Sequence, residues 1–143
     1  MLKDHNEKLI RVVVAIIKKN GKLLVAERPP GKPYSGYWEF PGGKIEANEE
    51  SAAALKRELQ EELGIQVLLA KPWFTHTHTY PDKTVLLEMW IVQEYTPEPE
   101  GKEMQTLQWV TWDEMRALRL LEGNWAIIEK MKEYLNGSIE NNI

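Results

Sequence analysis

The alternation of apolar and polar positions predicts a chain built mostly of strands. Residues 9–19 are rich in Val and Ile, and residues 22–27 form a second apolar run after the turn signal Asn20-Gly21. Asn-Gly between two apolar runs is typical of a β-hairpin. Residues 28–37 are dense in Pro and Gly and are expected to be an irregular loop. Further strands are expected at 38–41, 66–79, 84–95 and 107–112, and helices at 48–63, 112–118 and 124–135.

The clearest helix is the one expected over residues 48–63. Asn48 is its expected N-cap and Gly64 its expected stop. The apolar stripe that faces the core is expected to contain Ala52, Leu55, Leu59 and Leu63. Asp113 is expected to open the short helix near residue 112. Because strands dominate and two longer helices interrupt them, we expect an α/β fold with helices on the faces of a mixed sheet.

Composition indicates an ordinary globular domain. The chain has 143 residues, of which 43% are hydrophobic and 28% charged, so we expect one domain over residues 1–143 with a frayed tail at 137–143. The absence of cysteine excludes disulfides, thiolate nucleophiles and Cys-type zinc sites. The sequence shows no apolar run of signal-peptide or membrane-spanning length. We therefore expect a cytoplasmic protein with no membrane partner, and a monomer by default.

The net charge of −4 argues against a nucleic-acid partner. Proteins that bind nucleic acids usually present a basic surface, and this chain has no basic cluster. An acidic protein can still bind a small polyphosphate when a divalent cation neutralises both partners. A small-molecule partner is therefore expected.

Glu58, Glu61 and Glu62 lie together beside the apolar stripe of the 48–63 helix. Like charges at these spacings repel each other, and partial burial makes the repulsion worse. The group is either a solvated acidic face or a site for a hard cation such as Mg²⁺, which prefers oxygen ligands. Arg57, four residues before Glu61, is positioned to orient it. These residues alone leave both interpretations open.

The residues around this helix favour the metal site. The order is Gly43, five residues, Glu49, seven residues, Arg57-Glu58-Leu59, one residue, Glu61-Glu62, one residue, Gly64-Ile65. This segment, residues 43–65, resembles the Nudix box, complete at every defining position. The resemblance implies an α/β/α sandwich around a mixed sheet. It also implies hydrolysis of a nucleoside diphosphate linked to another moiety, with Mg²⁺, or Mn²⁺ as a substitute.

The similarity extends beyond the box to the MutT branch of the Nudix hydrolases. It is carried by Arg28 after the second strand, by residues 38–46 (WEFPGGKIE), by Gly101-Lys102-Glu103 and by Gly123-Asn124. The resemblance implies conversion of 8-oxo-dGTP to 8-oxo-dGMP and pyrophosphate, which cleans the nucleotide pool and avoids mutations.

The resemblance also implies a role for each matching residue. The metal ligands would be the Gly42 carbonyl, Glu58, Glu61, Glu62 and Glu103. The catalytic group would be Glu58, Glu61, Glu103, Lys44 and Arg57, with Lys44 near the phosphates and with Glu58 and Glu103 both open as the general base. Substrate would meet Arg28 at the phosphate chain, Glu39, Phe40, Pro41 and Gly42 around the base, and Asn124 at the purine edge.

Several of these residues have simpler interpretations. Phe40 is equally a core aromatic, and Asn124 is equally the N-cap of the last helix. Arg28 would in that case only cap its loop, Lys44 would be a surface residue, and Glu103 would be one more solvated acid. His76 and His78 share a strand face without a supporting motif, and we expect them to be structural.

Other substrates and another class stay open. CTP or a modified dCTP, ADP-ribose and dinucleoside polyphosphates are alternatives within the superfamily. Lys83 and the 31–36 loop (GKPYSG) depart from the MutT pattern and bear on base selectivity. A non-catalytic nucleotide-binding Nudix module is the other class, but such modules typically lose box glutamates that this chain keeps.

Overall fold

The computed structural model describes residues 8–135, so the tail at 137–143 lies outside the described residues. The strands of this part are β1 (Lys8–Lys19), β2 (Lys22–Glu27), β3 (Trp38–Glu39), β4 (Gly42–Lys44), β5 (Gln66–Tyr80), β6 (Lys83–Thr96) and β7 (Thr106–Val110). The helices are α1 (Ser51–Leu63), α2 (Trp112–Arg116) and α3 (Glu122–Leu135). Strand β4 was not expected from the sequence.

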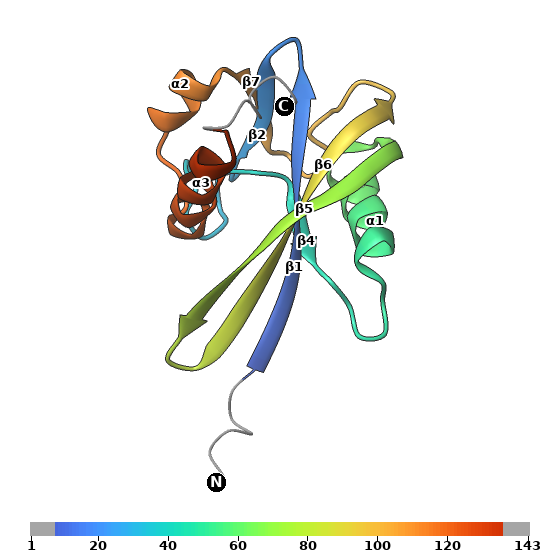
Figure 1. Cartoon of the computed structure of the whole chain (residues 1–143). Coiled ribbons are helices and arrows are strands. Elements are labelled where there is room, and N and C mark those ends of the chain that lie inside the picture. The colour runs from blue at the N-terminus through green and yellow to red at the C-terminus, as the bar shows by residue number, and fades with distance from the viewer. Residues whose placement is uncertain (1–7, 136–143) are drawn as a thin grey trace, which may run out of the picture.

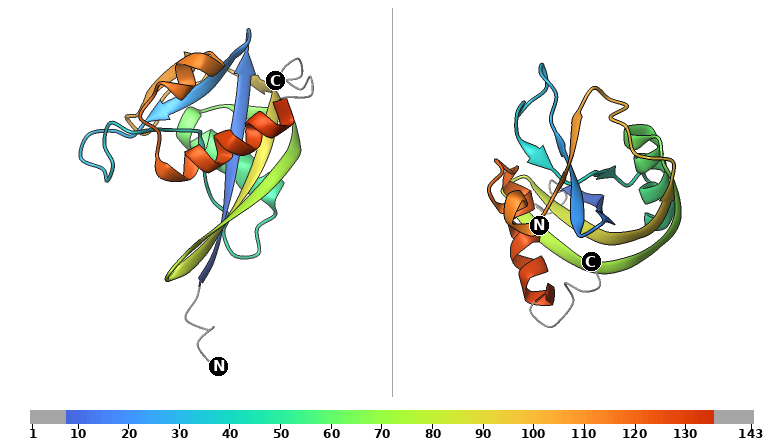
Figure 2. Two further views of the ribbon diagram at one scale, coloured as in Figure 1. Left: turned by 60° about the vertical axis from the view of Figure 1, so that its left-hand side comes forward. Right: turned by 90° about the horizontal axis from the view of Figure 1, so that it is seen from above.

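The strands form one mixed sheet with β1 at its centre. The order is β3-β2-β1-β6-β5, while β4 pairs with β1 and β7 pairs with β2. Strands β1 and β6 are parallel, and the other pairs are antiparallel. Helix α1 lies on one side of the sheet, and α2 and α3 lie on the other (Figures 1 and 2). The expected α/β/α sandwich is confirmed.

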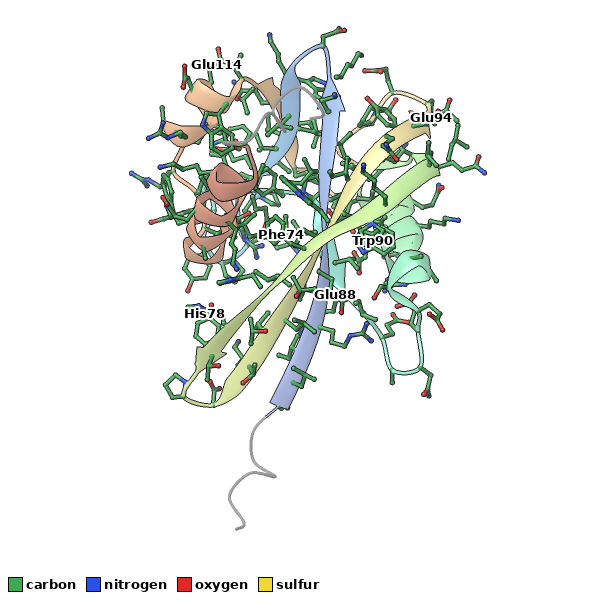
Figure 3. All side chains as sticks on the ribbon, in the orientation of Figure 1. Phe74, His78, Glu88, Trp90, Glu94 and Glu114 are labelled. Atoms are coloured by element: carbon green, nitrogen blue, oxygen red, sulfur yellow. The ribbon has the colours of Figure 1, made fainter. Side chains whose placement is uncertain are left out.

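The core has two halves, one on each face of β1. Because successive strand residues point to opposite faces, Val13 packs in the cluster that contains α1, whereas Val14 packs in the cluster that contains α3. Phe74 of β5 lies on the α3 side and Trp90 of β6 on the α1 side (Figure 3). The core therefore consists of two apolar clusters, one on the α1 side and one on the α3 side, with the sheet between them.

The start of α1 differs from the expectation. Asn48 is not the N-cap: its φ is 63°, and it lies in the turn before the helix. Asn tolerates this left-handed conformation better than most residues. The N-cap is Glu50, which makes no side-chain capping hydrogen bond. Gly64 is confirmed as the stop, with a φ of 69° and a hydrogen bond from its N–H to the Gln60 carbonyl.

The apolar stripe of α1 was also wrong at one position. Ala52 is exposed, and Ala54 is the alanine buried with Leu55, Leu59 and Leu63. Ala52 lies inside the first turn of the helix, but its side chain does not reach the core.

The other helix starts are corrected as well. Thr111, rather than Asp113, opens α2 through a capping box with Glu114, and this helix ends at Arg116. Helix α3 begins at Glu122, so Asn124 lies inside its first turn and is not its N-cap. The N–H of Asn124 donates to the Leu121 carbonyl at 2.9 Å.

A polar cluster fixes the start of α1 to the sheet. Arg11 of β1 donates to Glu88 of β6 and to Ser51 of α1, both at 2.8 Å, and the Ser51 hydroxyl donates to Glu88. Glu88 lies on the sheet between these elements (Figure 3). Ser51 thus ties the first residue of the helix to two parallel strands.

Within residues 8–135, no helix has the length and apolar character needed to cross a membrane.

Candidate active site

A cleft of about 740 Å³ opens beside the central strand. Its floor comes from β1 and β4, and its walls come from two loops, residues 28–37 and 97–105, together with the start of α3. The two loops lie side by side because Glu27, at the end of β2, pairs with Thr106, at the start of β7. The sheet register therefore decides which loops face each other across the cleft.

All six predicted substrate contacts line this cleft: Arg28, Glu39, Phe40, Pro41, Gly42 and Asn124. Two further predicted metal ligands, Glu62 and Glu103, also line it. Glu58, Glu61, Arg57 and Lys44 belong to α1 and β4 but are not part of the lining. The roles assigned to these four residues stay predictions.

The Glu58 carboxylate packs against the backbone of Gly43, a residue of the cleft floor. A Cβ atom at Gly43 would lie 2.3 Å from the Glu58 carboxyl carbon. Only glycine leaves room for this approach of a side chain to the backbone. Next to it, the N–H of Gly42 donates to Glu62 Oε1 at 3.4 Å. The glycine of the box thus makes space for the first glutamate of the box.

Glu58 and Glu62 lie close together. Burial, and then a side-chain hydrogen bond with Glu58, raise the pKa of Glu62 to about 9. The nearby charge of Glu103 contributes in the same direction. This raised pKa indicates that two partly buried carboxylates placed this close together are unfavourable as a pair of negative charges.

This donor set fits a hard divalent cation. The closely placed groups are carboxylates, and Mg²⁺ prefers oxygen ligands. Within residues 8–135 no set of three or more His, Cys, Asp or Glu side chains is already arranged around one metal position. The Glu58–Glu62 pair, with the charge of Glu103 nearby, is therefore the part of the arrangement that supports a cation.

The Arg57 side chain makes hydrogen bonds to several residues of the Nudix box segment, residues 43–65. Its Nε and Nη2 donate to the two carboxylate oxygens of Glu49 at 2.8 and 2.9 Å. Its Nη1 donates to Glu58 at 3.1 Å, and Nη2 also donates to the Lys44 carbonyl at 3.0 Å. The expected contact with Glu61 exists but is longer, at 3.5 Å. Arg57 therefore orients mainly Glu58 and binds the loop before α1 to the helix.

The hydrogen bonds from Arg57 to Glu49 also affect the ionisation of Glu49. The paired hydrogen bonds from Arg57 lower the pKa of Glu49 to about 2. A forked guanidinium–carboxylate pair of this kind combines energy with fixed geometry.

Asn124 and Phe40 meet at the inner end of the cleft. The N–H of Phe40 donates to Asn124 Oδ1 at 3.2 Å. Phe40 is only 5% exposed and belongs to the α3-side core, so it serves both the core and the cleft wall. Because the Asn124 oxygen faces the Phe40 N–H, its NH₂ group is the part left for another partner.

Arg28 lines the cleft but is already paired. Its Nη1 donates to Glu39 at 3.2 Å, and its Nε donates to the Pro33 carbonyl at 2.7 Å. Burial, opposed by the nearby Arg28, raises the pKa of Glu39. The pair brings one charge of each sign to the cleft wall.

Sequence reasoning missed several residues of the lining, three of which have polar or flexible side chains on loops. Lys32 comes from the 31–36 loop, which was noted only as a departure, and Met104 and Gln105 come from the 97–105 loop. The described residues show no ion pair for the Lys32 ammonium. The Pro and Gly pattern of residues 28–37 predicted a loop, but not that its lysine faces the cleft.

His76 and His78 do not line the cleft. The His78 ring packs edge-on against Tyr80, with centroids 4.4 Å apart. Burial, and then the charge of Lys130, lower the pKa of His76.

The structure places a mixed sheet between helices, with half-buried carboxylates of α1 beside a glycine turn. The chain belongs to the Nudix family: the family model described as NUDIX domain matches residues 12–130. It therefore acts on pyrophosphate bonds of small nucleotides, and Nudix hydrolases generally use divalent metals for this.

Relatives with two different names resemble the chain. A CTP pyrophosphohydrolase of Escherichia coli is 35% identical over 122 residues, covering 85% of this chain and 90% of the relative. An 8-oxo-dGTP diphosphatase of Haemophilus influenzae is 34% identical over 127 residues, covering 88% and 93%. A solved MutT structure, from work on Aliivibrio salmonicida and Vibrio cholerae, has a TM-score of 0.72 at 30% identity, covering 86% of this chain and 96% of that one. These matches confirm the resemblance to the MutT branch.

Proposed function

We propose that this protein is a Mg²⁺-dependent nucleoside triphosphate pyrophosphohydrolase that converts 8-oxo-dGTP to 8-oxo-dGMP and pyrophosphate. The hydrogen bond between Phe40 and Asn124 in the cleft carries the selection against guanine, and the relatives named 8-oxo-dGTP diphosphatase support 8-oxo-dGTP as the substrate. The carboxylates of the Nudix box carry the assignment of the chemistry.

The metal would be held by oxygen ligands at the α1 end of the cleft. We assign these to Glu58, Glu61, Glu62, Glu103 and the Gly42 carbonyl. Mg²⁺ or Mn²⁺, when bound, neutralises phosphate oxygens and lowers the pKa of a coordinated water. Cation binding would favour the ionised form of Glu62, whose pKa is raised by burial and by Glu58.

The reaction we propose is attack of water on the β-phosphorus, which breaks its bond to the oxygen shared with the α-phosphorus. The water oxygen ends in pyrophosphate, and the nucleoside monophosphate leaves with the bridging oxygen. The proton of the water passes to a glutamate. Glu58, oriented by Arg57, and Glu103, on the exposed 97–105 loop, are the two candidates.

The phosphate chain would meet the basic residues of the 28–37 loop. Lys32 has its charge free of ion pairs within the described residues, whereas Arg28 is shared with Glu39 and Pro33. We assign Lys32 to the phosphate chain together with Arg28. Lys44 is a further cation at the end of β4. Its carbonyl accepts a hydrogen bond from Arg57, and it does not line the cleft.

The base would replace the hydrogen bond between Phe40 and Asn124. Opening it exposes a donor and an acceptor side by side, with the Asn124 NH₂ as a second donor. The oxidised edge of 8-oxoguanine offers an N7–H donor beside the O6 acceptor, which matches. Guanine offers two acceptors at this edge, so the Asn124 oxygen would face a lone pair. Such a mismatch costs about 1–3 kcal/mol.

CTP is the second candidate, and the same contact favours it. The N4 amino group of cytosine is a donor beside the N3 acceptor, so it also matches the exposed pair. The relative named CTP pyrophosphohydrolase adds support. The Asn124 site would therefore select against guanine. Other residues of the cleft would have to discriminate between 8-oxoguanine and cytosine.

The test is a substrate panel in Mg²⁺, containing 8-oxo-dGTP, dGTP, CTP, ADP-ribose and diadenosine polyphosphates. We expect the highest kcat/KM for 8-oxo-dGTP, at least about tenfold above dGTP, which corresponds to 1.4 kcal/mol. In ¹⁸O-labelled water the label should appear in pyrophosphate. A kcat/KM for CTP equal to or above that for 8-oxo-dGTP would replace the first candidate by the second. Label in the monophosphate would contradict attack at the β-phosphorus.

A further inference from the structure

One side chain outside the Nudix box connects the backbones of two proposed metal ligands, Glu103 of the 97–105 loop and Glu62 of the box. Gln105 Oε1 accepts a hydrogen bond from the N–H of Glu103 at 2.7 Å. Gln105 Nε2 donates to the backbone carbonyl of Glu62 at 3.1 Å. Gln105 is half-buried and lines the cleft. Its amide thus joins the 97–105 loop to the end of α1.

The carbonyl that Gln105 holds needs a partner from outside the helix. Glu62 lies in the last turn of α1, where carbonyl oxygens have no partner within the helix. Two further bonds from the loop satisfy carbonyls of the same turn. The N–H of Lys102 donates to Glu62 at 2.9 Å, and the N–H of Glu100 donates to Leu63 at 3.0 Å. The loop therefore caps α1, and Gln105 is the side-chain part of that cap.

The loop backbone is shaped closely around Gln105. A Cβ atom at Gly101 would lie 2.1 Å from the Gln105 carbonyl oxygen, so no larger residue fits there without movement. Met104, between Glu103 and Gln105, has a φ of 68°, a conformation that few residues other than glycine adopt. This reversal allows the Gln105 side chain to reach back to the N–H of Glu103.

We propose that Gln105 is a positioning residue, which fixes the backbone of Glu103 relative to that of Glu62 so that both carboxylates reach one cation. The proposal rests on the proposed function, because it assigns both glutamates to the metal. A neutral amide suits this task, since it donates and accepts at once without adding charge beside the acids. A methionine there would keep the length and volume but lose both hydrogen bonds.

The first measurement needs neither metal nor substrate. In the metal-free wild-type protein we expect the amide hydrogen of Glu103 to exchange more slowly than that of Met104, for which the described residues show no backbone acceptor. In Gln105→Met the Glu103 amide should lose this protection. Gln108→Met is the matched control, because Gln108 is exposed on β7 and makes no side-chain hydrogen bond within residues 8–135. Equal protection of the Glu103 amide in the wild type and Gln105→Met would overturn the proposal.

The second measurement is Mn²⁺ affinity without nucleotide. We expect Gln105→Met to weaken binding roughly tenfold, since loss of a group that orients a metal ligand typically costs 10–100-fold. Gln108→Met should bind as the wild type does. A merely structural role would lower the thermal midpoint of unfolding of Gln105→Met without this selective loss of affinity, and that result would overturn the proposal.

A double-mutant cycle separates the proposal from the proposed function. Glu103→Gln alone should weaken Mn²⁺ binding, and adding Gln105→Met should then change the affinity by less than about twofold, because both act through one ligand. Additive losses would contradict positioning of Glu103 by Gln105. Wild-type affinity in both Glu103→Gln and Glu62→Gln would instead contradict the metal assignment of the proposed function itself.

Discussion

The backbone N–H of Phe40 donates a 3.2 Å hydrogen bond to the side-chain oxygen of Asn124, which lies 84 residues further along the chain. One partner belongs to the segment that leads into β4, and the other to the first turn of α3. The bond places a matched donor and acceptor at the inner end of the cleft. The proposed choice of base depends on this contact.

Asn124→Ala should weaken the selection of the base while sparing the metal site. Removal of the amide leaves the Phe40 N–H without its acceptor and the substrate without a partner, at a cost of about 1–3 kcal/mol. We expect kcat/KM for 8-oxo-dGTP to fall roughly 10–100-fold, mainly through KM, and kcat/KM for dGTP to fall less. Steady-state kinetics check this, with Mn²⁺ affinity as the control. An unchanged ratio between the two substrates would remove Asn124 from base recognition.

Lys32→Gln should raise KM more than it lowers kcat. We expect a rise of roughly tenfold, since a hydrogen bond to a charged group is worth about 1.5 kcal/mol or more. Lys56→Gln is the matched control, because Lys56 is exposed on α1 and does not line the cleft. The rise should also shrink as ionic strength increases, because salt screens exposed charges. Equal KM values for both variants would separate Lys32 from the phosphate chain.

Glu49→Gln should lower stability in a pH-dependent way. The folded-state pKa of Glu49 is lowered to about 2, mainly by hydrogen bonds from Arg57. A lowered pKa means that the ionised group stabilises the fold above pH 4.5, and that this contribution is lost as pH falls from 4.5 towards 2. The difference in thermal midpoint between wild type and variant should be constant from pH 7 to about 5 and then shrink. Glu50→Gln, on the exposed neighbour, should show no such trend. A difference that persists at pH 2 would exclude the ion pair as its cause.

For Glu62 we predict the opposite pH dependence of stability in the metal-free protein. Burial and the neighbouring Glu58 raise its pKa from 4.5 to about 9. The fold therefore loses stability as pH rises from 4.5 to 9, because ionisation in the folded state is unfavourable. With EDTA at pH 8, Glu62→Gln should be more stable than the wild type, and saturating Mg²⁺ should stabilise the wild type more than the variant. Unfolding curves with and without Mg²⁺ check this. If Glu62→Gln is the less stable protein in EDTA, the crowded-carboxylate account is wrong.

The sequence predicted the parts of the fold that rest on local patterns. All strands except β4, the mixed sheet and the Gly64 stop of α1 follow from apolar runs and a glycine cap. Asn48 was misassigned because an asparagine that turns the chain resembles an asparagine that caps a helix. Ala52 was misassigned because helical spacing places it beside Leu55, whereas in the structure Ala54 is the alanine that packs in the core.

The part of the site that lies within one helix, α1, could be predicted from the spacing of its residues. Glu58 and Glu62 are brought together by α1 itself, and the box spacing shows them. Lys32 and Gln105 enter the cleft only because β2 pairs with β7, which brings two loops together. No local pattern reports that pairing. For the same reason, the bond from Phe40 to Asn124 was visible only in the folded chain.

The central claim is that the carboxylates of α1 hold a Mg²⁺ ion that hydrolysis requires. The most direct test is the turnover of 8-oxo-dGTP in saturating Mg²⁺ by Glu62→Gln, with its thermal midpoint measured in parallel. We expect a folded protein whose kcat has fallen by at least about a hundredfold, because loss of a group that only orients a metal ligand already costs about 10–100-fold. A folded Glu62→Gln protein with a near-normal kcat would contradict the metal assignment.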